Sequence, residues 1–199
     1  MSLTVACVLS PGPTYNRTHV DRLEAMVAKH MRQPYKFVCV EDSPFPGWWA
    51  KVSLFQPGRF SGRVLYLDLD VTVIGSLDDL ANLPATFAIV ENFKEIKETN
   101  NAKFNSSVMS WDADHVDDIT DLFTKFTPSV MDILSGDQDW ISEQLPNVST
   151  FPKDWCVSYK VRRFLKLRTM PKDARVVCYH GKPKPFDMQD NDLDGFTRV

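Results

Sequence analysis

The sequence lacks an excess of positive charge and a long hydrophobic run. Its 199 residues include 23 Lys and Arg against 26 Asp and Glu, so the formal net charge is −3. A nucleic-acid partner would need a local basic patch, and we expect no such partner. The segment from Met1 to Leu9 has no basic leader and leads directly into Pro-Gly-Pro-Thr. We therefore expect neither a signal peptide nor a transmembrane segment there.

Cysteine is scarce, with four residues that show no metal-finger spacing. Three of them lie in apolar runs, where a thiol behaves as a small hydrophobic side chain. This usage favours a reduced, cytoplasmic compartment. A chain of this length can remove roughly 70% of its unfolded surface from water, which is enough for one core. We expect one domain over 1–199, with a loose polar tail at 187–199.

Strand-like and helix-like segments alternate along the chain. Apolar, β-branched runs predict strands at 3–9, 35–40, 63–67, 87–90, 104–109 and 175–179. Apolar residues spaced by three and four predict helices over 18–31 and 116–126. Shorter helical segments are expected at 48–55 and after a capping box at 76–79. This alternation predicts the α/β class, with one Rossmann-like domain whose mostly parallel central sheet is flanked by helices.

Two carboxylates follow the predicted strand 63–67. Asp68 and Asp70 are two residues apart, and strand side chains at that spacing project to the same side. Neighbouring carboxylates repel each other unless a cation lies between them. One or two carboxylates plus substrate phosphates are the usual ligands of Mg²⁺ or Mn²⁺. The pair therefore predicts a manganese or magnesium site that neutralises a departing diphosphate, although a bare Asp-x-Asp is more often an acidic surface turn.

Five stretches of the chain resemble the glycosyltransferases of the GT-A fold, most closely the family of glycogenin and the bacterial lipooligosaccharide galactosyltransferases. They are Pro13–Tyr15, Trp49–Phe55, Leu65–Leu80, Phe104–Met109, and the pair Gly136–Asp139 and Tyr179–Phe186. The stretch around the two aspartates is the most specific match. The order and spacing agree over almost the whole chain. Ser107 departs from the pattern, because glycine is usual there.

The resemblance implies a metal-dependent transfer of a hexosyl group from a UDP-sugar, with retention, to an unidentified glycan, lipid-linked or protein acceptor. Asp137 and Gln138 match residues beside the anomeric carbon and are assigned catalytic roles, because charge develops there on an oxocarbenium-like sugar. Tyr15 is expected to stack on the uracil. The other donor-binding residues implied by the resemblance are Lys51, Asp68, Asn105, Ser106, Gly181 and Lys184, the last on the diphosphate.

The third metal ligand is open, because Cys178 stands where the family has histidine. His180 lies two residues further, on the same face of the predicted strand, and can supply an imidazole. Manganese and magnesium prefer oxygen and imidazole to thiolate, which favours His180 over Cys178. A purely structural role for His180 is almost equally well supported.

Two alternatives belong to other classes. The run Asp68-x-Asp70-x-Thr72 also resembles the opening motif of haloacid-dehalogenase-like phosphatases, in which Asp68 would be the nucleophile and Asp70 an acid. That motif normally lies on the first strand, whereas two strand-and-helix units precede it here. The second alternative is a catalytically degenerate module that binds a nucleotide-sugar, suggested by the departure at Cys178.

Two further features receive weaker interpretations. Four tryptophans, Trp48, Trp49, Trp140 and Trp155, could offer faces for sugar stacking, but tryptophans of a compact domain are mostly core or wall residues, and only Trp155 is a candidate wall for the acceptor. A basic cluster is interpreted as a solvated face rather than a site for an anionic glycan, a lipid diphosphate or a membrane. Its members are Lys160, Arg162, Arg163, Lys166 and Arg168.

Overall fold

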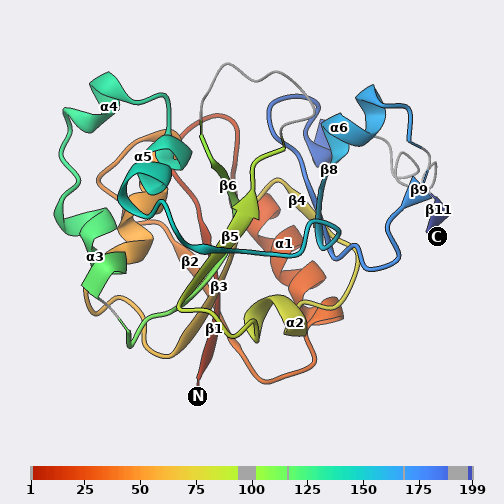
Figure 1. The fold of residues 1–199 in the computed structure, drawn as a ribbon, viewed down its shortest axis with the longest axis horizontal. Helices are drawn as coiled ribbons and strands as arrows, with labels where there is room; N and C mark the ends of the chain where they lie inside the picture. The colour runs from red at the N-terminus through yellow and green to blue at the C-terminus, as the bar shows by residue number, and fades with distance from the viewer. Residues whose placement is uncertain (1, 94–101, 116, 168, 188–196, 199) are drawn as a thin grey trace.

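A six-stranded sheet forms the centre of the computed structural model, which describes residues 2–93, 102–115, 117–167, 169–187 and 197–198 (Figure 1). The spatial order is β2-β1-β3-β6-β5-β7. The bounds are β1 Leu3–Val8, β2 Lys36–Val40, β3 Arg63–Leu67, β5 Phe87–Glu91, β6 Phe104–Asp112 and β7 Ser149–Thr150. Within this sheet β6 runs antiparallel to both neighbours and the other pairs are parallel. The prediction of a mostly parallel α/β sheet is confirmed.

Two smaller sheets lie beside the central one. The first has the order β4-β10-β8, with β4 at Val71–Val73, β10 at Val176–Cys178 and β8 at Cys156–Ser158. Strand β4 directly follows Asp70, and β10 leads into the loop that contains Lys184. This sheet therefore brings the turn of Asp70 and the loop of Lys184 together. The second pairs β9, Thr169–Met170, with β11, Thr197–Arg198. The tail predicted to be loose is thus paired at β11, and 188–196 and 199 lie outside the described residues.

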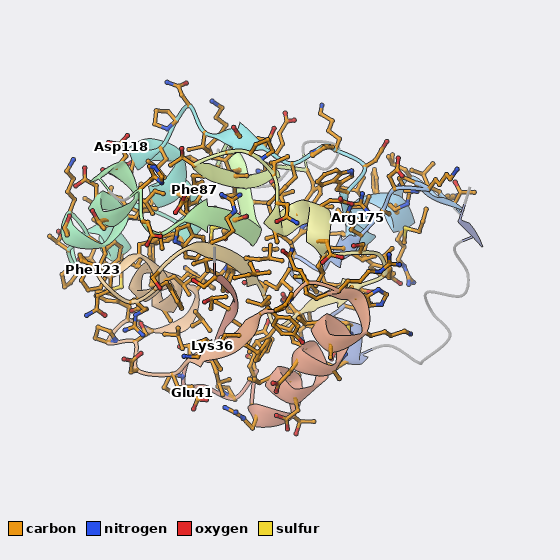
Figure 2. All side chains as sticks on the ribbon, turned by 90° about the horizontal axis from the view of Figure 1, so that it is seen from below. Lys36, Glu41, Phe87, Asp118, Phe123 and Arg175 are labelled. Atoms are coloured by element: carbon orange, nitrogen blue, oxygen red, sulfur yellow. The ribbon has the colours of Figure 1, made fainter. Side chains whose placement is uncertain are left out.

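Helices cover both faces of the central sheet (Figure 1). Helices α1, Arg17–His30, and α2, Asp78–Ala81, lie on one face. The 3-10 helix η1, Gly47–Phe55, covers the other face with α3, Asp117–Thr124, and α5, Asp137–Gln144. The remaining helices are α4 Val130–Ile133, α6 Tyr159–Phe164 and the 3-10 helix η2 Pro185–Asp187. Seen from below, Phe123 of α3 and Arg175 lie on opposite sides of the molecule (Figure 2).

The alternation of β3 side chains separates two apolar clusters. Leu65 and Leu67 pack against the α1 face, whereas Val64 and Tyr66 pack against the face under η1, α3 and α5. This is the period-two pattern of a strand buried on both sides. The strand therefore delivers Asp68 at a point where both covering layers meet.

Helix α1 begins and ends close to the predicted bounds. Asn16 caps it, because its side chain accepts from the Thr18 amide while the His19 side chain accepts from the Asn16 amide. Its apolar stripe of Val20, Leu23 and Val27 is fully buried. No helix in the described part of the chain is long and apolar enough to cross a membrane.

The predicted capping box at 76–79 is wrong. Helix α2 begins at Asp78, and its N-cap residue Leu77 makes no side-chain cap. The Asp78 carboxylate instead accepts hydrogen bonds from the backbone amides of Arg32 and Gln33, at 3.1 and 3.2 Å. It therefore anchors the chain just beyond α1, and Ser76 donates to this same carboxylate at 2.9 Å.

Arg63 opens β3 at the amino edge of the sheet, close to the N terminus of the chain (Figure 1). Its guanidinium donates to the carbonyls of Ala81, Leu83 and Ala85 at 2.6 to 2.8 Å. Its amide donates to the Ser2 carbonyl at 2.9 Å. These bonds satisfy carbonyl groups at the end of α2. They also bind the N-terminal segment to the end of β3 that lies opposite the aspartates.

Candidate functional site

Asp68 and Asp70 lie in the turn between β3 and β4. Neither belongs to a strand, so the alternation argument used to orient them was wrong. The turn is held by the Asp68 amide, which donates to the Ser107 carbonyl at 2.9 Å. Burial and then the charge of Asp68 raise the pKa of Asp70. A turn, and not strand alternation, therefore orients the two carboxylates.

Lys51 joins three elements around one buried ammonium group. Its Nζ lies 3.0 Å from Oδ1 of Asp68 and 3.3 Å from Oδ2 of Asp137, and it donates to Ser106 Oγ at 2.9 Å. The Lys51 side chain is only 11% exposed. Burial opposes its charge, but Asp137 and Asp68 raise the pKa of Lys51 overall. The lysine therefore stays charged and compensates both carboxylates.

Asp137 is the first residue of α5, directly after the N-cap Gly136. Its side chain is buried and accepts from Ser106 Oγ at 2.5 Å. Burial raises the pKa of Asp137, although Lys51 and Ser106 favour the ionised form. The adjacent Gln138 has a buried Oε1 that finds no hydrogen-bond donor among the described residues. The two residues assigned to catalysis are therefore adjacent to the lysine cluster and one of them has an unused acceptor.

An irregularity in β6 directs Ser106 into this cluster. Ile89 pairs with Met109, but the next residue, Val90, pairs with Asn105, so 106–108 have no partner in β5. Such bulges re-aim side chains and are frequent beside active sites. Asn105 is also buried, but its Oδ1 accepts from the Ser107 amide at 3.1 Å, which stabilises the bulge. Ser106 thus reaches the cluster directly and Asn105 supports it.

Asp70 forms the centre of a second group of contacts. Its Oδ2 accepts from the Tyr15 hydroxyl at 2.8 Å and forms a salt bridge with Lys184. Burial and the charge of Asp70 raise the pKa of Tyr15, so the phenol remains a donor. The Tyr15 ring packs edge-on against His19 and Phe186. Tyr15 was predicted to stack on uracil, and in this structure its hydroxyl is bound to the predicted metal ligand.

Gly181 and Lys184 belong to the loop between β10 and η2. Gly181 has a φ of +78°, and a Cβ added there would meet nothing within 4 Å. The glycine is thus required by backbone conformation rather than by space. The turn redirects the chain so that Lys184 reaches Asp70, whose position is 114 residues earlier. The structure therefore brings Lys184 to Asp70, and Gly181 shapes the loop that carries this lysine.

His180 does not join Asp68 and Asp70 in this structure. Its Nε2 lies 2.5 Å from Ser158 Oγ, and its ring stacks on Phe93 at 5.4 Å between centroids. Cys178 is fully buried, and burial, Cys156 and the carboxylates raise the pKa of its thiol well above the usual range. Because only a thiolate is a good ligand, a protonated Cys178 is a poor one. The choice of His180 as the third ligand stays a prediction, in which either Nδ1 or an Nε2 released from Ser158 would bind the ion.

The donor set fits a hard divalent cation in part. Among the described residues, no group of three or more His, Cys, Asp and Glu side chains could hold a metal ion. Asp68 and Asp70 each accept a lysine ammonium group, so each already binds positive charge. The raised pKa of Asp70 also reflects carboxylate repulsion that a cation would relieve. The two aspartates fit as two oxygen ligands, and phosphates, water or a displaced side chain must supply the rest.

Sequence reasoning missed Tyr66, whose hydroxyl donates to Asp68 Oδ1 at 2.6 Å. The sequence feature that could have indicated Tyr66 is its position two residues before Asp68, on the side of β3 that faces η1. Trp155, the candidate acceptor wall, is half-buried and carries the Arg175 guanidinium 4.5 Å from its ring centre. In the basic cluster, Arg163 and Lys166 are exposed and Lys160 and Arg162 are half-buried, so the solvated face is supported in part.

Comparisons with known proteins show the fold. No family model and no curated protein matches the chain. The chain is similar in structure to the glycosyltransferase GlyE of Streptococcus pneumoniae TIGR4, with 14% sequence identity and a TM-score of 0.63. The match covers 94% of this chain and 57% of GlyE. It matches 93% of a glycosyltransferase involved in glycosylation of the major capsid of PBCV-1, over 89% of this chain, with 15% identity and a TM-score of 0.64.

A third solved structure is galactosyltransferase LgtC in complex with donor and acceptor sugar analogs. It shares 15% identity and a TM-score of 0.60, with 96% of this chain and 90% of that chain covered. The chain spans only 57% of GlyE and 47% of the bifunctional glycosyltransferase WbbM. At these identities the likeness shows the architecture, which is the GT-A fold that the sequence predicted.

Proposed function

We propose that this chain is a metal-dependent glycosyltransferase that moves a hexosyl group from a UDP-sugar to an acceptor, with retention. The observation that carries the proposal is the buried cluster in which Lys51 binds Asp68 and Asp137. Beside it, Lys184 binds Asp70. Two lysines and three carboxylates gathered after the central strand of a GT-A fold suit a ligand that carries a diphosphate and a cation.

The donor's diphosphate is the part that the lysines would recognise. Asp68 and Asp70 would hold the cation, which would supply positive charge to the departing phosphates. Lys184 then exchanges Asp70 for the diphosphate, where its point charge stabilises the leaving group. Lys51 would hold Asp68 and Asp137 in place during this exchange through its contacts with both carboxylates and with Ser106.

Asp137 and Gln138 are assigned to the reacting sugar. As the bond from the anomeric carbon to the diphosphate oxygen breaks, the acceptor oxygen would form its bond to that carbon and pass its proton to the departing diphosphate. Positive charge develops on the sugar, and the Asp137 carboxylate and the Gln138 carbonyl oxygen are the nearby negative groups that would stabilise it. The unused Gln138 Oε1 supports this role, since an unpaired buried acceptor costs about 1–3 kcal/mol.

The deciding experiment is a thermal-shift screen of nucleotide-sugars with Mn²⁺, followed by assay of UDP release and sugar transfer. A ligand that binds only the folded state raises the melting temperature by mass action. We expect UDP-sugars to raise it and other nucleotide-sugars to leave it unchanged. Stabilisation without turnover would indicate the degenerate binding module. Hydrolysis of p-nitrophenyl phosphate with no response to UDP-sugars would indicate the phosphatase.

We keep the cytoplasm as the proposed compartment. The four cysteines are all free thiols in this structure, and three of them are buried. Reduced cysteines of this kind are usual where glutathione and thioredoxin keep thiols reduced. Periplasmic or extracellular recovery of the native protein in cell fractionation would contradict this assignment.

A further inference from the structure

Two of the four cysteines lie opposite each other on neighbouring strands. In the parallel pair of β1 and β2, Cys7 pairs directly with Cys39. Opposite residues of adjacent strands point to the same face of the sheet, and both thiols pack in the apolar cluster under α1. The two side chains are hydrogen-bonded to each other. The sulfur atoms are therefore already in contact across the strands.

The two thiols differ in their access to solvent. Cys7 is 0% exposed, whereas Cys39 is half-buried. Strand β2 stands at the end of the six-stranded order, so among the described strands its only neighbour is β1 (Figure 1). Glu41, which follows β2, lies at the rim of the molecule (Figure 2). A reagent in solution therefore reaches Cys39 first, and Cys7 only through it.

The charge environment makes Cys39 the more reactive thiol. The hydrogen bond from Cys7 lowers the pKa of Cys39 and outweighs the opposing effect of burial. The same bond and burial raise the pKa of Cys7 above its usual range. The Arg17 guanidinium also lowers the pKa of Cys39, while Glu41, the salt-bridge partner of Arg17, raises it. Cys39 is thus the thiol that ionises, and Cys7 stays protonated and donates to it.

The other two cysteines provide a contrast within the same chain. Cys156 lies opposite Val176 and Cys178 lies opposite Ser158, so the two cysteines of β8 and β10 are offset by two residues. Both are buried, and burial raises the pKa of each thiol. Buried thiols of this kind behave as inert, small hydrophobic side chains. Of the four cysteines, only Cys7 and Cys39 combine direct opposition with partial exposure.

The backbone permits a covalent bond between Cys7 and Cys39. Neighbouring strands lie about 4.7–4.9 Å apart. The Cα atoms of two disulfide-bonded cysteines are usually about 4.4–6.8 Å apart. Residues that are directly opposite each other in β1 and β2 fall within this window, so the bond requires no change of register.

We propose that Cys39 and Cys7 form a redox-active dithiol, which a small-molecule disulfide of the glutathione type oxidises to an intramolecular disulfide. Cys39 is the attacking residue and Cys7 is the resolving residue. The pair shares no residue with the proposed transferase site, so this inference does not depend on that function. Disulfides of cytosolic proteins are usually transient and catalytic or redox-sensing, which agrees with the proposed compartment.

The reaction consists of two exchanges. The Cys39 thiolate attacks one sulfur of the reagent, whose S–S bond breaks, and the first small thiolate leaves and takes up a proton from water. Cys7 then loses its proton and attacks the Cys39 sulfur, which breaks the mixed disulfide and releases the second small thiolate to be protonated in turn. Two protein thiols and one small disulfide thus yield one protein disulfide and two small thiols. Two electrons pass from the protein to the reagent.

The first test uses the unaltered, fully reduced protein with oxidised glutathione. The protein is then denatured with N-ethylmaleimide present to block the remaining thiols, and mass spectrometry of the intact chain and its peptides identifies the products. We expect a species lighter by two hydrogen atoms in which the peptides of Cys7 and Cys39 are linked, with Cys156 and Cys178 still reduced. The proposal is overturned by a glutathione adduct that persists on Cys39 without a link to Cys7, by a first reaction at Cys156 or Cys178, or by no reaction.

The second test separates the two roles. Cys7→Ala removes the resolving thiol, so Cys39 should accumulate as a mixed disulfide with one glutathione. Cys39→Ser removes the attacking thiol, so oxidation of Cys7 should become at least about tenfold slower. Cys156→Ala is the matched control and should leave the rate of linkage unchanged. Equal rates of Cys7 oxidation with and without Cys39 would overturn the assigned order. If Cys7→Ala does not fold, the linked peptides of the unaltered protein still decide.

Discussion

The Tyr15 hydroxyl donates a hydrogen bond to Asp70 Oδ2 at 2.8 Å and so joins the loop after β1 to the turn after β3. The same oxygen binds Lys184. Tyr15, which was predicted to stack on the nucleobase, and Lys184, which was predicted to bind the diphosphate, thus both contact Asp70, a predicted metal ligand. A cation that binds Asp70 must compete with both contacts. We therefore expect metal binding and donor binding at the proposed site to be coupled.

The first prediction follows from this coupling. UDP should bind at least about tenfold more tightly with Mn²⁺ than with EDTA, because the cation takes over Asp70 and frees Lys184 for the phosphates. Isothermal titration calorimetry measures both affinities. Equal affinities in the two conditions would show that Asp68 and Asp70 do not hold a metal that contacts the donor.

Asp70→Asn should lower turnover by on the order of a hundredfold or more, because one charged metal ligand and the partner of Lys184 are lost. Asparagine is nearly isosteric, so the fold should survive. Steady-state kinetics gives the rate, and circular dichroism with thermal melting checks the structure. Near-normal transfer by a folded Asp70→Asn protein would sink the assignment.

The third ligand can be tested with two variants. His180→Ala should weaken Mn²⁺ binding together with donor binding, whereas Cys178→Ser should leave both within a few-fold, because the Cys178 thiol stays protonated. Manganese titration of each variant in the presence of UDP is the measurement. The reverse ranking would transfer the role to Cys178. If neither variant changed the affinity, the ion would be held by carboxylates, phosphates and water.

Lys51→Met should destabilise the fold by about 3–5 kcal/mol, because it leaves two buried carboxylates without their common cation. Urea unfolding measures the loss. Lys125→Met is the matched control, since Lys125 is 61% exposed in its salt bridge with Asp121 and such surface pairs contribute about 0–1 kcal/mol. A loss as small as that of the control would mean that Asp68 and Asp137 do not depend on Lys51.

Asp78 provides a prediction about pH. Burial raises the pKa of Asp78, but hydrogen bonds from the Gln33 and Arg32 amides outweigh it and lower the pKa below its usual value. A lowered folded-state pKa gives stability that is present above the unfolded pKa, about 3.9, and lost as pH falls through the folded value. Asp78→Ala should therefore cost about 1–3 kcal/mol at pH 7.

The difference between Asp78→Ala and the unaltered protein should shrink as the pH falls below about 4, where the carboxylate protonates first in the unfolded state and then, at lower pH, in the folded state. Denaturant unfolding at a series of pH values measures this. The exposed Asp132 offers a control, and Asp132→Ala should show a small effect at every pH. A constant Asp78→Ala difference down to the acid end would show that the lost stability does not come from the charged form.

The sheet strands were the most predictable part of the fold, because apolar runs such as Arg63–Leu67 are buried on both faces and need no knowledge of their neighbours. The site was less predictable. Alternation was applied to Asp68 and Asp70, but the strand ends at Leu67 and a turn orients them. Where a strand ends depends on its partners, here on the Ser107 carbonyl that accepts from the Asp68 amide.

Long-range contacts account for most of what the sequence did not reveal. The capping box failed because Asp79, its acidic member, binds Arg175 far along the chain, which no local pattern signals. Trp48 was expected among core or wall tryptophans, and its exposure follows from the register of η1 against the core. Only the packing of Trp49 and Val52 decides which side of that helix remains open.

The amino edge of the sheet offers a practical handle. The Arg63 contacts and the Ser2 carbonyl lie at the start of β3, whereas Asp68 follows its end. A biotin or solid support attached through an extension before Ser2 would therefore hold the protein by the edge remote from Lys51 and Lys184. Oriented in this way on a sensor surface, the chain would present its polar cluster to the solution. The support would then not obstruct the binding of dissolved ligands.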